Sequence, residues 1–229
     1  MILFDNGPCG KPAVFATPVR LVLAETPAEV PAALSALDSA RRAGHWLAGY
    51  ASYELGYALE PRLLPLMPAG RRAPLLAFGV YNAPRDATDC LAEADALAGE
   101  AILGPAEPVM DRASYQTAFD TVQRYIAAGD CYQVNLTFPL RARVSGAPLA
   151  LYGALRRRQP VGQGAYVALG VGPILLSRSP ELFFRLDGEG MIEVRPMKGT
   201  APRVLDPAQD EAVRKALAAS PKNRAENLM

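Results

Sequence analysis

The chain has 229 residues, half of them hydrophobic, and its 24 basic and 23 acidic residues give a net charge of +1. This length allows one large domain or two small ones with a sizeable core. The balanced charge gives no electrostatic support for binding to nucleic acid or to a membrane surface. We therefore expect a small molecule or another protein as the partner.

The cysteines and the N-terminal sequence predict a cytoplasmic location. Cys9, Cys90 and Cys131 are widely spaced and form no CxxC pair, which favours reduced thiols over a zinc site or a disulfide framework. The first residues lack the basic region of a signal peptide. No apolar run approaches the roughly 20 residues that a membrane-spanning helix needs, so no membrane segment is expected.

The first half of the chain predicts strands separated by helices. Residues 19–24 form a β-rich run, and Thr26-Pro27-Ala28-Glu29 then has the pattern of a capping box with Pro at the first helical position. This pattern begins a helix that Gly44 can end. Further predicted elements are strands at 46–54 and 75–81 and a helix at 89–98. Prolines and small residues at 99–108 mark the predicted domain boundary.

The second half predicts helices and antiparallel hairpins. Asp111 can cap a helix with one apolar stripe, which Gly129 can end. Residues 131–144 alternate between apolar and polar and predict a long strand, with Pro139 at an edge or a bulge. A helix at 148–158, strands at 165–170 and 174–178, and a helix that begins at Asp206-Pro207 follow. Together these elements predict an α+β fold with mostly antiparallel sheets and helices on the outside.

The end of the chain indicates a fragment. Ser220-Pro221-Lys222 begins a helical pattern, and the sequence stops at Met229 before any C-terminal cap. We therefore expect the chain to be a piece of a longer polypeptide.

Residues 179–185 and 195–200 predict a β-hairpin whose turn contains Asp187-Gly188-Glu189-Gly190. A turn centred between Gly188 and Glu189 would place Glu181 opposite Pro196. Lys198 would then be its diagonal neighbour on the same face, roughly 7–8 Å away, with space for a six-membered ring between them. An odd-count turn would place the two side chains on opposite faces.

Glu181 and Lys198 each have two interpretations. Both can be solvated residues at strand ends, without a chemical role. Alternatively, Glu181 is a general acid whose pKa is raised by apolar neighbours such as Leu182 and Phe183. Lys198 would then be a nucleophile or a cation that partial desolvation makes reactive.

Three other residues are candidates for binding. Gly199 and Thr200 can present backbone N–H groups and a hydroxyl to a carboxylate of the substrate. Glu226, in the last predicted helix, is either a ligand of Mg²⁺ or a solvated residue. The sequence contains no G-x-G-x-x-G motif, so dinucleotide binding has no support.

Four segments occur in an order and at spacings that resemble the chorismate-utilising enzymes: residues 129–136, 177–181, 195–203 and 222–229. This family includes the first components of anthranilate synthase and aminodeoxychorismate synthase, and the isochorismate and salicylate synthases. The resemblance implies an incomplete version of that family's two-sheet fold. Residues 1–103 would be the N-terminal region of the anthranilate synthase component I type, and residues 109–229 the first part of the chorismate-binding catalytic domain.

Lys198 makes the sequence similar to the aminodeoxychorismate synthase branch, because anthranilate synthases usually carry Ala there. The resemblance implies amination of chorismate to 4-amino-4-deoxychorismate, for p-aminobenzoate and folate, with ammonia from a glutamine amidotransferase subunit. Two alternatives remain: an enzyme like anthranilate synthase component I with an atypical lysine, and a catalytically inactive fragment of the family.

The same resemblance implies roles for the candidate residues. Lys198 would attack C2 of the chorismate ring while Glu181 protonates the leaving C4 hydroxyl, and ammonia would then add at C4 and expel the lysine. Gly199 and Thr200 would bind the substrate, and Glu226 would be one ligand of Mg²⁺. The family's second magnesium ligand and remaining chorismate contacts belong to a part that the 229 residues do not include, so we expect this chain alone to be inactive.

Overall fold

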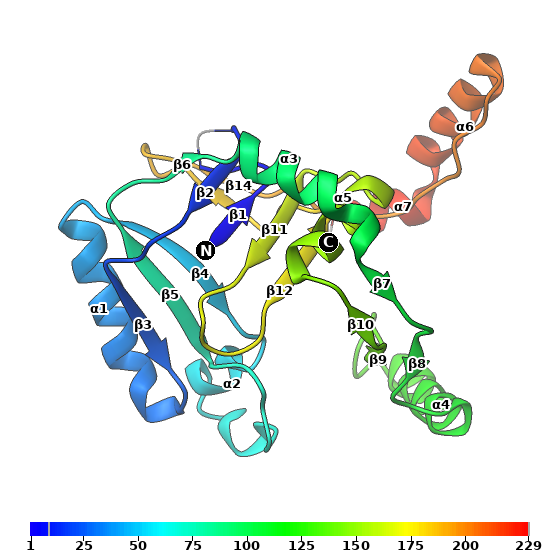
Figure 1. The fold of residues 1–229 in the computed structure, drawn as a ribbon. Helices are drawn as coiled ribbons and strands as arrows, with labels where there is room; N and C mark the ends of the chain where they lie inside the picture. Colours follow the sequence, from blue (N-terminus) through cyan, green and yellow to red (C-terminus); the bar gives the residue numbers. More distant parts are fainter. Residues whose placement is uncertain (9, 229) are drawn as a thin grey trace. The chain divides into compact units, whose positions relative to one another are not determined.

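The computed structural model describes residues 1–8 and 10–228 (Figure 1). It divides into two compact units, of which the first contains residues 1–91 and 159–229 and the second residues 92–158. The parts 1–103 and 109–229 stay a prediction. Cys90 and Cys131 carry free thiols, whereas the prediction for Cys9 lies outside the described residues.

Two antiparallel sheets form the core of the first unit. The larger has the order β12 (Leu175–Ser179), β11 (Gln163–Val167), β1 (Ile2–Phe4), β2 (Ala13–Phe15) and β6 (Arg85–Asp86). The smaller has the order β3 (Arg20–Ala24), β5 (Leu76–Tyr81) and β4 (Trp46–Ala51). Buried side chains from both sheets form one cluster, in which the rings of Phe15 and Tyr81 lie 5.1 Å apart. The α+β prediction is confirmed.

Helix α1 (Val30–Arg42) packs on the smaller sheet through a second core cluster (Figure 1). It follows the 3-10 turn η1 (Pro27–Glu29), where the predicted capping box is present: the Glu29 carboxylate accepts the Thr26 N–H at 2.9 Å. Gly44 lies after the helix with φ +85°. Local capping chemistry and one apolar face therefore define this helix, as predicted.

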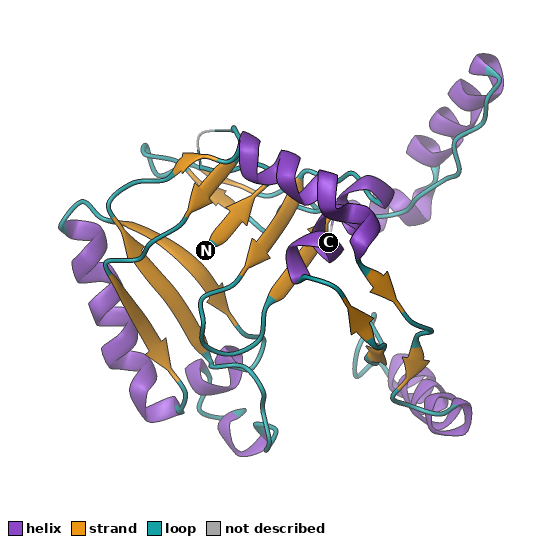
Figure 2. Ribbon diagram, viewed as in Figure 1, coloured by secondary structure: helices purple, strands orange, loops and turns teal. Residues whose placement is uncertain are grey.

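The rest of the first unit consists of short elements. Helix α2 (Leu55–Leu59) and the turn η2 (Leu64–Leu66) lie between β4 and β5. After β12 come β13 (Arg185–Leu186), β14 (Ile192–Glu193), α6 (Pro207–Ala219) and α7 (Pro221–Leu228). Figure 2 shows the loops that separate these elements. The predicted cap of α6 is confirmed, because the Asp206 carboxylate accepts the Gln209 N–H at 2.8 Å.

The second unit contains two complete α-helices, one 3-10 helix and four strands of two residues each. Helix α3 (Thr88–Ala96) begins in the first unit and ends in the second. The other elements of the second unit are η3 (Leu97–Glu100), β7 (Ile102–Leu103), β8 (Glu107–Pro108), α4 (Arg112–Ala128), β9 (Leu140–Arg141), β10 (Val144–Ser145) and α5 (Pro148–Arg158). As predicted, Asp111 caps α4 by accepting the Ser114 N–H, and Gly129 ends it in the left-handed conformation with φ +79°. Strand β7 pairs with β10, and β8 pairs with β9.

The prediction of one long strand at residues 131–144 is wrong. Only Leu140–Arg141 and Val144–Ser145 are paired, each with a strand of two residues. Pro139 has no N–H for a ladder, and residues 132–139 lie outside any strand. Alternation alone therefore did not produce a long strand here, because within the described residues each short strand has a partner of only two residues.

Helix α5 packs closely against the chain around Ala94 at Gly153. A Cβ added at Gly153 would overlap with the backbone carbonyl of Ala94. Nearby, Arg156 Nε and Asp95 Oδ1 form an ion pair of 3.1 Å. We expect Gly153→Ala to lower the free energy of unfolding by about 1–3 kcal/mol, because the helix must move away.

Thermal unfolding followed by circular dichroism tests this expectation. The matched control is Gly56→Ala in α2, where an added Cβ meets nothing within 4 Å. This control should leave the midpoint unchanged or raise it slightly, because Ala has the higher helix propensity. Equal midpoints for the two variants would contradict the close packing of α5.

None of the helices in residues 1–8 and 10–228 is long and apolar enough to cross a membrane.

Candidate active site

The hairpin forms, but its register differs by one residue from the prediction. Arg185 pairs with Glu193 and Leu186 with Ile192, which places Glu181 opposite Met197 when the register is continued. The turn therefore has the odd count that the sequence left open, and the diagonal between Glu181 and Lys198 expected from an even count does not follow from this register. Asp187 Oδ1 accepts the N–H groups of Glu189 and Met191 at 2.9 Å each. These bonds stabilise a turn with an odd number of residues between the paired strands.

A different contact brings Glu181 to the residue before Lys198. Glu181 Oε1 accepts the backbone N–H of Met197 at 3.2 Å. Ser179 holds the start of this segment, because its Oγ accepts the Glu181 N–H at 3.2 Å and donates to the Glu181 carbonyl at 2.9 Å. The hydrogen bond from the Met197 backbone to the Glu181 carboxylate thus joins the two candidate catalytic segments, which lie outside the β-ladder of the hairpin.

Ion pairs hold the two short strands of the hairpin together. Glu193 binds Arg185 on the opposite strand and Arg195 in its own segment. The hydrogen bond from Arg195 is the largest cause that keeps the pKa of Glu193 below its usual range, and the charge of Arg185 adds to it. Both arginines thus bind Glu193, whereas the Glu181 carboxylate binds the Met197 N–H.

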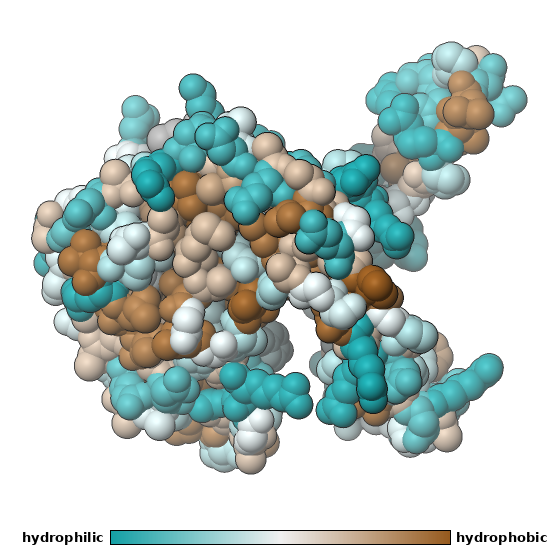
Figure 3. Space-filling view, viewed as in Figure 1, coloured by the Kyte–Doolittle hydropathy of each residue, from teal (hydrophilic) through white to brown (hydrophobic). Residues whose placement is uncertain are grey.

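The apolar enclosure expected around Glu181 is not found. The Glu181 side chain is exposed, and Phe183 is 87% exposed. Lys198 is exposed as well. On the face of the molecule that Figure 3 draws, apolar residues are likewise exposed at the surface among polar residues. The reactivity of both residues as acid and nucleophile therefore stays a prediction from the motifs.

Helix α7 lies directly against the loop that carries Lys198. Gly199 has φ +44°, and a Cβ added there would lie 2.5 Å from Cγ of Asn223. A glycine is needed at this position for both reasons. Thr200, the second predicted substrate-binding residue, follows in the same loop with an exposed side chain.

Lys198 lines a hollow of about 390 Å³ between this loop and helices α6 and α7. Asn223 and Arg224 line the same hollow, together with Leu217 and Asn227. Two cations and two amides suit an anionic ligand. Sequence reasoning missed Asn223 and Arg224 individually, although both lie in the motif 222–229.

Glu226 lies in α7 with its side chain 26% exposed, and its Oε1 is 3.8 Å from Lys222 Nζ. The described part of the chain contains no group of three or more potential metal-ligating side chains. One carboxylate beside an ammonium group does not make a magnesium site, because Mg²⁺ takes near-octahedral oxygen coordination. The residues present therefore do not fit a complete magnesium site.

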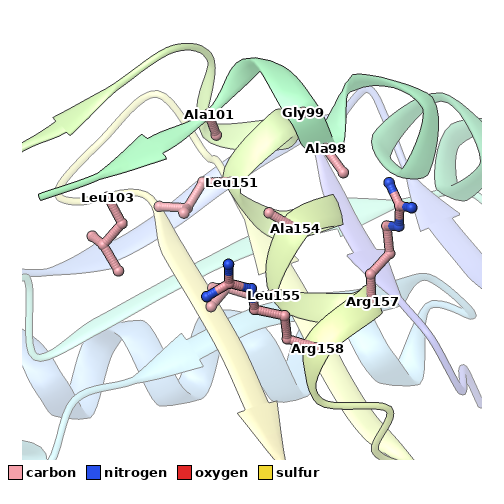
Figure 4. A pocket seen from close by; sticks show the side chains of 9 residues that line it. All are labelled: Ala98, Gly99, Ala101, Leu103, Leu151, Ala154, Leu155, Arg157 and Arg158. Atoms are coloured by element: carbon pink, nitrogen blue, oxygen red, sulfur yellow. The ribbon is translucent and has the colours of Figure 1, made fainter.

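A second hollow, of about 510 Å³, lies within the second unit between η3, β7 and α5 (Figure 4). Its lining is apolar except for Arg157 and Arg158. It contains none of the predicted site residues and no carboxylate or nucleophile, so its lining offers no groups for acid–base or covalent catalysis.

Comparison with known proteins defines the class. Residues 3–229 match the family model described as chorismate binding enzyme. The chain therefore belongs to the chorismate binding enzyme family, and the resemblance inferred from the four motifs is confirmed.

Among the relatives compared here, the chain is more similar to the aminodeoxychorismate synthases than to the anthranilate synthase. The chain is 46% identical over 127 residues to an aminodeoxychorismate synthase of Streptomyces griseus, which covers 55% of the chain and 17% of that protein. It is 43% identical over 120 residues to aminodeoxychorismate synthase component 1 of Klebsiella aerogenes, covering 52% and 26%. It is 39% identical over 111 residues to anthranilate synthase component 1 of Streptomyces coelicolor, covering 47% and 21%. The match thus spans about a quarter or less of these relatives' own length.

Proposed function

We propose that the chain is part of an enzyme that converts chorismate and ammonia to 4-amino-4-deoxychorismate. The observation that carries this proposal is Lys198 within the segment Arg195-Pro196-Met197-Lys198-Gly199-Thr200, where the anthranilate synthase branch usually has Ala. The higher identity to the two aminodeoxychorismate synthases than to the anthranilate synthase supports the same choice.

The proposed reaction has two steps. The Lys198 amine forms a bond to C2 of the ring, the ring double bonds shift, and the C4–O bond breaks. Glu181 donates the proton with which the hydroxyl leaves as water, because hydroxide is a poor leaving group. Ammonia then forms a bond to C4, the double bonds shift back, and the C2–N bond to Lys198 breaks.

The arrangement of the site is consistent with these roles. The Glu181 carboxylate is hydrogen-bonded to the residue before Lys198, so the acid and the amine belong to neighbouring backbone segments. Gly199 and Thr200 would face a substrate carboxylate, and Arg224 adds a cation to the hollow that Lys198 lines. The substrate carries two carboxylates, which suits this positive lining.

The proposal extends to partners and location. The name of the Klebsiella relative identifies it as one component of its enzyme, which supports a glutamine amidotransferase subunit as the source of ammonia here. The proposal also includes production of p-aminobenzoate for folate in the cytoplasm. It further includes a requirement for Mg²⁺, with Glu226 as one of several ligands.

Product analysis tests this function directly. The full-length gene product that contains this chain is incubated with chorismate, Mg²⁺ and ammonium, and the products are separated by chromatography. We expect 4-amino-4-deoxychorismate. The fluorescence of anthranilate would show instead an enzyme like anthranilate synthase. No turnover, and no thermal stabilisation of the protein by chorismate with Mg²⁺, would support an inactive member of the family.

A further inference from the structure

We propose that the largely buried ion pair between Asp5 and Arg178 positions Glu181. The inference rests on the proposed function, in which Glu181 is the acid. Asp5 directly follows β1, and Arg178 lies near the end of β12, three residues before Glu181. Their side chains form an ion pair and are only 11% and 6% exposed.

The ion pair is built into the sheet. Arg178 Nη2 also donates to the carbonyl of Gln159 at 2.9 Å. A buried ion pair with further hydrogen bonds has a defined geometry, and removal of one partner leaves an uncompensated charge. The pair therefore fixes Arg178 at the end of β12 to a segment 173 residues away in the sequence.

Strand β11 provides the space for this pair at Gly164. Gly164 is the partner of Arg178 in the antiparallel ladder, and its carbonyl accepts the Asp5 N–H at 3.0 Å. A Cβ at Gly164 would overlap with both Arg178 Nη1 and the Asp5 carboxylate. Three neighbouring strands thus contribute to a single arrangement, which orients the last residues of β12.

A short series of bonds extends from this arrangement to the acid. Ser179 follows Arg178 and binds both the N–H and the carbonyl of Glu181. Glu181 in turn accepts the N–H of Met197, next to Lys198. Asp5 and Arg178 do not contact the proposed reacting atoms, so they are positioning residues. Their loss is expected to move the acid relative to the amine.

The test measures two properties of the full-length gene product and its Asp5→Asn and Arg178→Lys variants. The first is the amination rate with ammonium, for which we expect kcat to fall about tenfold or more, with KM changed less than about twofold. A misplaced catalytic group can cost this much. The second is hydrogen exchange of the Met197 amide, which we expect to become about tenfold faster, because it loses its ordered acceptor.

A double-variant cycle separates positioning from stability. In a Glu181→Gln background, Asp5→Asn should lower the residual kcat no further, because the acid through which it acts is absent. The matched control is Asp38→Asn, an exposed carboxylate on α1 that pairs with Arg41 and Arg42. This control should leave both kcat and the exchange of Met197 unchanged.

Two results would overturn the inference. One is an equal further loss of kcat in the Glu181→Gln background, and the other is unchanged exchange of Met197 in the variants. Arg178→Lys keeps the charge, so it provides the same readouts if Asp5→Asn does not fold. If the wild-type protein does not aminate chorismate, the proposed function fails, and the exchange of Met197 still decides whether the ion pair positions Glu181.

Discussion

Replacement of Lys198 by Ala is expected to lower the amination of chorismate by ammonia by a factor on the order of 10³ or more, or about 4 kcal/mol in the barrier. The reason is the proposed covalent step, in which the lysine amine divides one difficult substitution into two easier ones. Without it, ammonia would have to displace the C4 hydroxyl directly. Steady-state kinetics of the full-length gene product with ammonium measure this effect without a glutaminase.

Lys215→Ala is the matched control for this variant. Lys215 lies on α6, with Nζ 3.7 Å from Glu211 Oε1, and its side chain is 71% exposed. Its removal should leave the rate within about twofold, because surface ion pairs contribute little. If Lys198→Ala retained a rate within about tenfold of the wild type, the lysine would not be the nucleophile, and a cationic binding role would explain the motif better.

Replacement of Glu181 by Gln is expected to lower kcat by about 10²–10⁴, the usual contribution of a general acid. The amide keeps the shape and can still accept the Met197 N–H with its oxygen, but it has no proton to donate to the leaving hydroxyl. We therefore expect KM for chorismate to change little. Loss of an interaction that the enzyme makes only in the transition state lowers kcat and leaves KM unchanged.

The control for Glu181 is Glu189→Gln, on the exposed turn of the same hairpin. Its backbone N–H binds Asp187, and the substitution does not affect that bond. This variant should have wild-type kcat and KM. If Glu181→Gln raised KM and left kcat unchanged, Glu181 would contribute to binding and not to proton transfer.

Local sequence signals predicted the helices well. The capping box at Thr26 and Glu29, the caps at Asp111 and Asp206 and the left-handed Gly129 all form as expected. Each of these signals is complete within one helical turn of sequence. The contacts that satisfy it do not depend on the rest of the fold, so the sequence alone could indicate them.

Elements that depend on distant partners were predicted less well. Strands β1 and β2 were not predicted, because three residues each, Ile2–Phe4 and Ala13–Phe15, are too few for a period to appear. Conversely, the clear alternation at 131–144 yields only two pairs of short strands. A strand needs a neighbour, and the neighbour is determined by tertiary structure.

In the candidate site, too, local motifs were predicted from the sequence, whereas contacts between distant residues were not. The motifs identified Glu181, Lys198 and Gly199, but the register of the hairpin differs by one residue, in a turn where Asp187 Oδ1 accepts two backbone N–H groups. The Asp5–Arg178 pair could not be inferred, because its members are 173 residues apart. Asn223 and Arg224 were within a recognised motif, yet only the fold places them beside Lys198.

Mass spectrometry of the covalent adduct tests the central claim, that Lys198 is the nucleophile, most directly. The full-length gene product is incubated with chorismate and Mg²⁺ without ammonia, denatured, and digested. We expect an added mass equal to chorismate less one water on the peptide that contains Lys198, and no such adduct in Lys198→Ala. An adduct of unchanged mass in Lys198→Ala, or its location on another residue, would contradict the account.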